Sequence, residues 1–272
     1  MGIDIKKVTK EVTPNAPGII LHSRGGLGKS TFVAQMCSSK ANSLLIQCGE
    51  DSLSDLKDEH KKDVPHLEDI VGGGATEKDK IQGWHDFIDL LRQLIVEDHP
   101  YKLIAFDNLD NIINVNMDAF VIHEHYDGNV SKANSYGGQK IEELALYSNQ
   151  IIEGFRMLQN KGITVVCTIH SHVVKSKDPL TDEFDMYDIS MPARKDINIR
   201  EIFINWASQV MFGTYDTVVV DKKAKGGQRV LKSDVNPAYK TKNRFDLPET
   251  IEFSYEAFKR AMSKDSKKKE DK

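Results

Sequence analysis

The segment 23–31, Ser-Arg-Gly-Gly-Leu-Gly-Lys-Ser-Thr, contains the residue types needed to hold a polyphosphate. Small residues allow consecutive backbone N–H groups to surround phosphate oxygens where a helix begins. Lys29 supplies a positive charge for the β- and γ-phosphates, and the hydroxyl of Ser30 is a ligand for Mg²⁺. Ser23 stands where the usual pattern has its first glycine. The alternative interpretation is a glycine-rich turn that does not bind phosphate. The predicted nucleotide-binding residues are Ser23, Arg24, Gly25, Gly26, Leu27, Gly28, Lys29, Ser30 and Thr31.

A second Mg²⁺ ligand is predicted where a later strand ends. The apolar run 103–106 is followed directly by Asp107. In phosphate-transferring enzymes with this type of loop, an aspartate at a strand end helps to hold the metal. We therefore predict Ser30 and Asp107 as the metal ligands, with the alternative that Asp107 only caps a turn.

Hydrolysis requires a group that orients or deprotonates the attacking water. Glu50 lies two residues after the predicted strand 43–48 and is our candidate, with Asp51 as its substitute. We expect this strand to lie next to the P-loop strand, which brings Glu50 toward the terminal phosphate. The alternative is that the acid caps a following helix.

Another polar residue follows the apolar run 163–168. His170 lies two residues after it, where a side chain can contact a terminal phosphate. The alternative is a structural histidine. The His123/His125 and His170/His172 pairs are weak evidence for a metal site.

These groups need a scaffold of alternating strands and helices, which is the pattern of an α/β fold with a mainly parallel sheet. The predicted strands are 18–22, 43–48, 102–106 and 163–168, and the predicted helices are 29–39, 81–96 and 141–158. The polar stretch 171–196 is predicted to be a long loop. A helix at 200–209 and a β-meander at 210–213, 217–220 and 228–231 are expected after it.

Composition excludes several classes of protein. The chain has 272 residues, 39% hydrophobic and 29% charged, which suits one large globular domain. It has no apolar run long enough to span a bilayer and no signal-peptide pattern, so we expect a cytoplasmic protein without membrane contact. Its three cysteines exclude a disulfide framework. The net charge is −4, but 222–244 contains eight basic residues and one acidic residue, a local excess able to bind phosphate.

Taken together, the motifs resemble the RecA-like branch of P-loop ATPases. In that branch a P-loop, a glutamate after the second strand, a strand-ending aspartate and a polar sensor occur in this order. The segment 242–248, Lys-Asn-Arg-Phe-Asp-Leu-Pro, resembles the RecA segment with two basic residues around an asparagine. The resemblance implies that Lys242 and Arg244 reach the nucleotide held by a neighbouring subunit.

The run 229–248 is more closely similar to phage-encoded RecA-like ATPases associated with single-strand annealing and recombination. The resemblance covers about 17–262, the expected ATPase core. It leaves 1–16 as an N-terminal segment and candidate oligomerisation arm, and 263–272 as a charged tail expected to be disordered. It also implies that DNA-binding loops lie in 114–138 and 171–200, although acidic residues crowd the second stretch. Basic and aromatic residues together suit single strands.

The resulting hypothesis is an ATPase that uses ATP and Mg²⁺ and oligomerises on single-stranded DNA, as a filament or a ring. ATP is expected at subunit interfaces, where Lys29, Glu50, His170, Lys242 and Arg244 form the catalytic set. A single-strand-binding protein is a candidate partner, and the host cytoplasm is the expected location if the protein is phage-encoded. The alternatives are a small-molecule P-loop kinase and a nucleotide-gated loader or adaptor of a replication protein.

Overall fold

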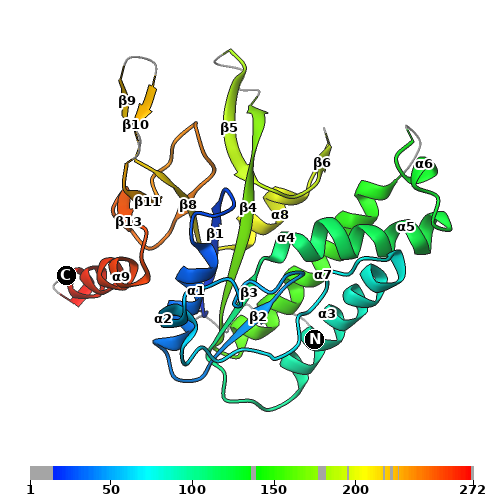
Figure 1. Cartoon of the computed structure of the whole chain (residues 1–272), viewed down its shortest axis with the longest axis horizontal. Coiled ribbons are helices and arrows are strands. Elements are labelled where there is room, and N and C mark those ends of the chain that lie inside the picture. The colour runs from blue at the N-terminus through cyan, green and yellow to red at the C-terminus, as the bar shows by residue number, and fades with distance from the viewer. Residues whose placement is uncertain are drawn as a thin grey trace, which may run out of the picture.

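The computed structural model describes residues 15–135, 139–176, 182–194, 196–216, 218–220, 223–225 and 227–270. Its centre is a sheet in the order β13-β11-β8-β1-β4-β3-β2, with helices on both faces (Figure 1). The five strands from β8 to β2 are parallel, and their bounds are β1 Gly18–Ser23, β2 Ser43–Gln47, β3 Leu103–Asp107, β4 Thr164–Ser176 and β8 Gln209–Tyr215. The predicted α/β class with a mainly parallel sheet is confirmed.

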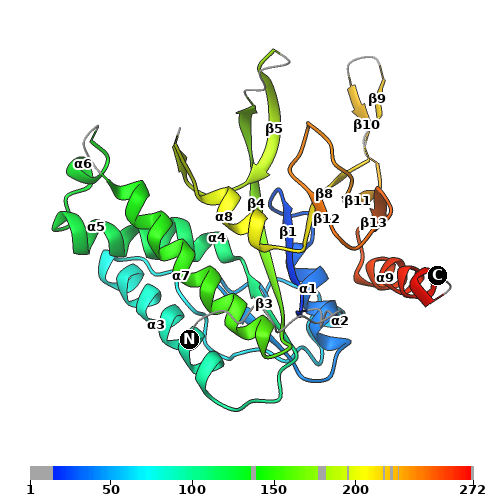
Figure 2. The same ribbon diagram turned by 180° about the vertical axis from the view of Figure 1, so that it is seen from behind.

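The parallel strands are buried on both faces, which explains why they read as continuous apolar runs. Along β1, Ile20 packs into the core on one face, while Ile19 and Leu21 pack into the core on the other. Helices α3 (Glu77–Val96), α7 (Lys140–Asn160) and α8 (Ile199–Trp206) contribute to the first core. Helices α1 (Lys29–Ser38) and α9 (Tyr255–Glu270) contribute to the second. Figure 2 shows α3 and α7 side by side from behind.

Local signals define the helices on the first face. Thr76 and Asp79 form a capping box at the beginning of α3, in which each side chain bonds the other residue's backbone N–H. Gly154 allows α7 to approach α3 closely, because a Cβ there would lie 2.7 Å from a methyl carbon of Leu91. The short helix α2 (Asp58–Lys61) precedes α3.

The position of β2 differs from our expectation. We expected this strand beside the P-loop strand, but β4 and β3 lie between β1 and β2, so β2 is the edge strand of the parallel set. Strand neighbours depend on the crossover connections, which the apolar runs do not encode. Glu50 must therefore reach the site from two strands farther away.

The first expected DNA loop, 114–138, is mostly helical in its described part, so the loop prediction is wrong there. Helices α4 (Leu109–Asn111), η1 (Ile112–Met117, a π-helix), α5 (Asp118–Tyr126) and α6 (Val130–Ala133) occupy 109–133. Apolar side chains along this run are buried in the core, which stabilises the helices. Tyr126 is among them, whereas 136–138 lie outside the described residues.

The second expected loop is also regular structure. Strand β4 continues to Ser176, and β5 (Phe184–Ile189) pairs with it in antiparallel fashion. The short strands β6 (Ala193–Arg194) and β7 (Ile197–Asn198) follow. The prediction of a loop over 171–196 is therefore wrong for the described residues. Polar side chains on a projecting hairpin hide the apolar alternation on which a strand prediction depends.

Strands are present in the carboxyl-terminal part of the chain, as predicted, but only some of them extend the sheet beyond β8. Strand β11 (Arg229–Lys232) pairs with β8 and with β13 (Thr250–Glu252), and β12 (Lys242–Asn243) pairs with β8, all antiparallel. Strands β9 (Val218–Val220) and β10 (Lys223–Lys225) form a separate hairpin. Helix α9 continues to Glu270, through a segment for which composition predicts disorder. No helix in the described part of the chain is long and apolar enough to cross a membrane.

Candidate active site

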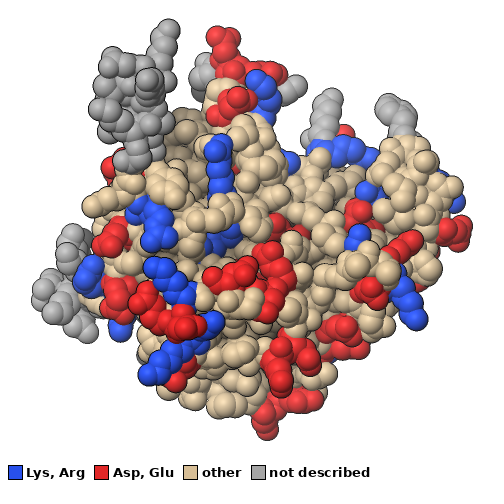
Figure 3. Space-filling view, in the orientation of Figure 1, with Lys and Arg blue, Asp and Glu red and all other residues tan. Residues whose placement is uncertain are grey.

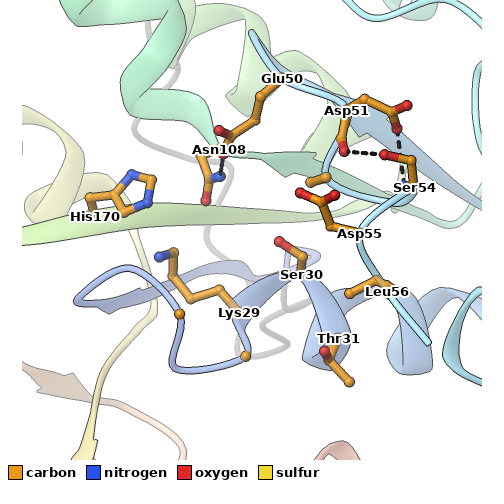
Figure 4. A pocket seen from close by; sticks show the side chains of 13 residues that line it. Lys29, Ser30, Thr31, Glu50, Asp51, Ser54, Asp55, Leu56, Asn108 and His170 are labelled. Carbon is orange, nitrogen blue, oxygen red and sulfur yellow. Dashed lines mark hydrogen bonds between the residues drawn. The ribbon is translucent and has the colours of Figure 1, made fainter.

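A cavity of about 570 Å³ opens where the turn after β1 and the segments after β2 and β3 meet the outer part of β4. Ligands of open α/β sheets bind outside the carboxyl ends of the strands, and this volume is within the usual range for small-molecule sites. In Figure 4, Lys29 and Ser30 project from one side of the cavity toward Asn108 on the other. The lining residues are Gly26, Gly28, Lys29, Ser30, Thr31, Glu50, Asp51, Ser52, Ser54, Asp55, Leu56, Asn108 and His170.

The glycine turn has the backbone conformation that phosphate binding requires. Gly28 is the N-cap of α1 with a φ of 109°, a region that only glycine occupies without strain. The guanidinium of Arg229 donates a hydrogen bond of 3.1 Å to the carbonyl of Leu27 and so holds the turn from outside. Arg229 was not among our predicted residues.

Lys29 lies at the floor of this turn and is only 5% exposed. Burial lowers the pKa of its ammonium group, while the carboxylates of Asp110, Asp107 and Glu50 act in the opposite direction. A buried ammonium group is stabilised by an anion. The cavity therefore favours an anionic ligand placed next to the Lys29 ammonium group.

The structure brings together only some of the predicted phosphate-loop residues. Ser23 is buried and donates its hydroxyl to the carbonyl of Arg24, and the Leu27 side chain is in the core. The Arg24 side chain lies over the Tyr187 ring, 4.9 Å from its centroid, and donates a hydrogen bond to the Tyr187 hydroxyl. Arg24 therefore connects the turn to β5 instead of lining the cavity, and Gly25 does not line it either.

Asp107 has the features expected of a metal ligand. It is fully buried, and one carboxylate oxygen accepts a hydrogen bond from the Thr168 hydroxyl. Its other oxygen, Oδ2, is buried without a hydrogen-bond partner among the described residues. A buried, unpaired carboxylate oxygen is costly unless a cation or bound water satisfies it. Asp107 and the cavity-lining Ser30 thus fit Mg²⁺, which typically binds through few protein ligands and several waters.

Glu50 is held toward the cavity by the residue after Asp107. The side-chain amide of Asn108 donates a hydrogen bond of 2.6 Å to a carboxylate oxygen of Glu50. Asp51, our substitute candidate, instead accepts a 3.1 Å hydrogen bond from the backbone N–H of Ser54. The geometry therefore favours Glu50 over Asp51 for activating water.

His170 lines the opposite part of the cavity and is anchored by Asp110. The Asp110 carboxylate accepts hydrogen bonds from the His170 backbone N–H at 3.1 Å and from ring Nδ1 at 3.0 Å. Neither Asn108 nor Asp110 was predicted, although both follow Asp107 within three residues and are polar. No group of three or more His, Cys, Asp or Glu side chains among the described residues forms a metal cluster, so the histidine pairs remain without support.

Lys242 and Arg244 do not contact this cavity within one chain. Strand β12 pairs with Gln209 and Val210, which lie level with Ile19 and Ile20 at the end of β1 away from the turn. The Lys242 ammonium donates hydrogen bonds of 3.0 and 2.9 Å to the last carbonyls of α8, those of Ile204 and Asn205. Arg244 is exposed beside a second cavity of about 560 Å³.

Comparison with known proteins adds the family. The model of the AAA domain matches residues 16–245, which is most of the chain. The chain belongs to the AAA domain family. Members of this family are P-loop ATPases, which supports nucleotide binding, typically with Mg²⁺, at the cavity described above. A comparison with curated proteins gives no match.

Proposed function

We propose that this AAA domain protein hydrolyses ATP with Mg²⁺ and oligomerises on single-stranded DNA, where it promotes annealing or recombination. The observation that carries the ATPase proposal is the convergence of Lys29, Glu50 and His170 on one cavity beside Asp107. This combination supplies a charge for phosphate, a base for water and a metal ligand in one place.

Each residue has a distinct part in the proposed reaction. The turn amides and Lys29 hold the phosphates, and Ser30 with Asp107 would hold Mg²⁺, which neutralises charge on the phosphate oxygens when bound. Glu50, oriented by Asn108, accepts a proton from the attacking water. His170 contacts the terminal phosphate and distinguishes ATP from ADP.

Trans-action by a neighbouring subunit remains part of the proposal, and Arg244 is its stronger candidate. Its guanidinium is exposed at the end of the sheet away from its own cavity. An exposed arginine in this position is available to a second copy, as arginine fingers are. Lys242 already bonds two carbonyls of its own chain and is therefore the weaker candidate.

The DNA proposal is supported by the projecting hairpins. Both the β4–β5 and β9–β10 hairpins extend from the same side of the sheet in the two opposite views (Figures 1 and 2), and β10 carries Lys223 and Lys225. Two acids that seemed to oppose DNA binding have partners: Asp185 pairs with Lys175 at 3.2 Å, and Asp188 is buried 3.6 Å from Arg200. These contacts reduce the repulsion of a phosphate backbone.

Charge elsewhere on the surface restricts where DNA can bind. Figure 3 shows acidic side chains dominating the lower middle of the face, below the hairpins. Cations that neutralise phosphates provide most of the affinity for nucleic acid. The hairpin side is therefore the proposed DNA side.

Two substitutions test the ATPase proposal. Lys29→Ala removes the buried charge below the phosphates, so we expect loss of ATP binding, measured by calorimetry with a non-hydrolysable analogue. Glu50→Gln keeps the hydrogen-bonding shape but removes the base, so ATP binding should persist while turnover falls by at least a hundredfold. Lys40→Ala, at an exposed lysine just after α1, is the matched control. Wild-type turnover in Glu50→Gln would refute the role of Glu50.

Phosphate release with and without single-stranded DNA separates the proposal from its alternatives. DNA should stimulate hydrolysis, and light scattering should detect larger assemblies when ATP and DNA are both present. A small-molecule kinase would ignore DNA and require an acceptor. A nucleotide-gated adaptor would bind ATP tightly with negligible turnover.

A further inference from the structure

Asp110 is a buried carboxylate with an unusual set of partners. It is 4% exposed, and its two oxygens accept hydrogen bonds from His170, one from the backbone N–H and one from the ring. A carboxylate is seldom buried without a specific partner. Here the partner is a residue that lines the candidate nucleotide cavity.

The two bonds fix His170 in both position and orientation. The backbone bond holds β4 at the level of Ser23, where the P-loop turn begins, because Ser23 and His170 are register partners. The ring bond makes Nδ1 a donor to the carboxylate. Nε2 is then the ring nitrogen available to a ligand, in the same way that a carboxylate orients the histidine of a catalytic triad.

We infer that Asp110 is a positioning residue that presents Nε2 of His170 to the terminal phosphate of ATP, so that the protein distinguishes ATP from ADP. This inference rests on the proposed function, because it assigns the cavity to a nucleotide. A phosphate oxygen is a hydrogen-bond acceptor, so His170 must donate to it from a protonated Nε2. The Nδ1–H of the same ring continues to donate to the Asp110 carboxylate. ADP lacks the terminal phosphate and gains nothing from this bond.

A competing role for Asp110 is to balance the charge of Lys29, because Asp110 is also the leading carboxylate influence on that ammonium group. The two roles differ in what they change. Charge balance at Lys29 affects every nucleotide with a β-phosphate, whereas positioning of His170 affects only those with a γ-phosphate. The two roles also differ in a double-mutant cycle with His170→Ala. If Asp110 acts through His170, its substitution has no further effect once the imidazole is removed.

The experiment measures affinities of the full-length protein for a non-hydrolysable ATP analogue and for ADP in four forms: wild type, Asp110→Asn, His170→Ala and the double variant. We expect Asp110→Asn to reduce the ratio of ATP to ADP affinity about tenfold, because the ring loses the anion that orients it and strengthens its hydrogen bond, and keeps only an uncharged Nε2–H for the phosphate. The ratio of ATP to ADP affinity should be no lower in the double variant than in His170→Ala. Asp89→Asn, on the exposed side of α3, controls for the loss of one negative charge.

The protonated nitrogen of the His170 ring provides a second test that does not depend on affinities. ¹⁵N spectra of histidine-labelled protein, with His170 assigned by its absence in His170→Ala, report which nitrogen is protonated in the neutral ring. We expect Nδ1–H in the wild type and a shift to Nε2–H in Asp110→Asn. A neutral wild-type ring with its proton on Nε2 instead of Nδ1, equal loss of ATP and ADP affinity in Asp110→Asn, or a double variant worse than His170→Ala would each overturn the inference. A wild type that binds neither nucleotide would instead overturn the proposed function.

Discussion

The buried side chain of His22 makes the stability of the fold around the P-loop depend on pH. It is the penultimate residue of β1 and is fully buried. Its Nε2–H donates to the Lys240 carbonyl at 2.7 Å, and its Nδ1 accepts from the Ser171 hydroxyl at 2.9 Å. This arrangement satisfies the neutral ring, and a proton on Nδ1 would remove the acceptor for Ser171. Burial, opposed by the Lys240 hydrogen bond and assisted by the charge of Lys29, lowers the pKa of His22 from 6.5 to about 4.

The sign and size of the effect on stability follow from proton linkage. The unfolded chain takes up a proton at His22 as pH falls below 6.5, whereas the folded chain resists protonation until about pH 4. Stability from this group is therefore undiminished above pH 6.5 and falls steadily between the two values. Between pH 7.5 and 4.5 the loss amounts to about 2.5 kcal/mol of unfolding free energy.

Urea unfolding at the two pH values measures this loss. Other groups titrate over the same range, so the test compares wild type with His22→Gln, whose side chain cannot be protonated. The fall in unfolding free energy should be about 2.5 kcal/mol smaller in the variant. His123→Gln, at an exposed histidine, should leave the fall unchanged. Equal pH dependence of wild type and His22→Gln would refute the argument that burial keeps His22 neutral.

Three further predictions concern the metal ligand and the residues proposed to act at the subunit interface. Thr168→Val removes the donor to Asp107, so it should reduce the unfolding free energy by about 1–3 kcal/mol and weaken the Mg²⁺ dependence of ATP binding, while Thr168→Ser should retain both. Urea unfolding and Mg²⁺ titration check this, and an unchanged Thr168→Val would contradict it. Lys242→Ala should lower stability by about 1 kcal/mol through loss of the α8 carbonyl contacts. Arg244→Ala should leave stability intact but abolish the stimulation of ATP hydrolysis by assembly. Activity should return when Arg244→Ala subunits are mixed with Lys29→Ala subunits, because the second kind supplies the missing arginine. No recovery in the mixture would count against trans-action.

The strands of the core and the P-loop could be predicted because their signals are local. A buried parallel strand is a short apolar run, and the glycine turn that follows β1 precedes a helix in the sequence as in the structure. The same signals identified Asp107 as a strand-ending residue and Glu50 as a residue after β2. These predictions required no knowledge of which strands are neighbours.

Contacts between distant parts of the chain could not be predicted in this way. Thr168 reaches Asp107 because β3 and β4 pair in a register in which Phe106 lies opposite Cys167, and a one-residue slip of one strand would place the two side chains on opposite faces. The edge position of β2 depends on how the helices cross the sheet. The π-helix and the β4–β5 hairpin were missed because polar residues in these segments obscure the apolar period.

The segment 107–110 connects the proposed metal, water-activating and sensor groups. Asp107 would hold the metal, Asn108 donates to Glu50, and Asp110 holds His170. Glu50 follows the edge strand of the parallel set, and the bond from Asn108 connects its side chain to the end of β3. Three groups held by four consecutive residues move together when that segment moves. In the proposed ATPase, a shift of this segment would therefore change metal binding, water activation and phosphate sensing as one event.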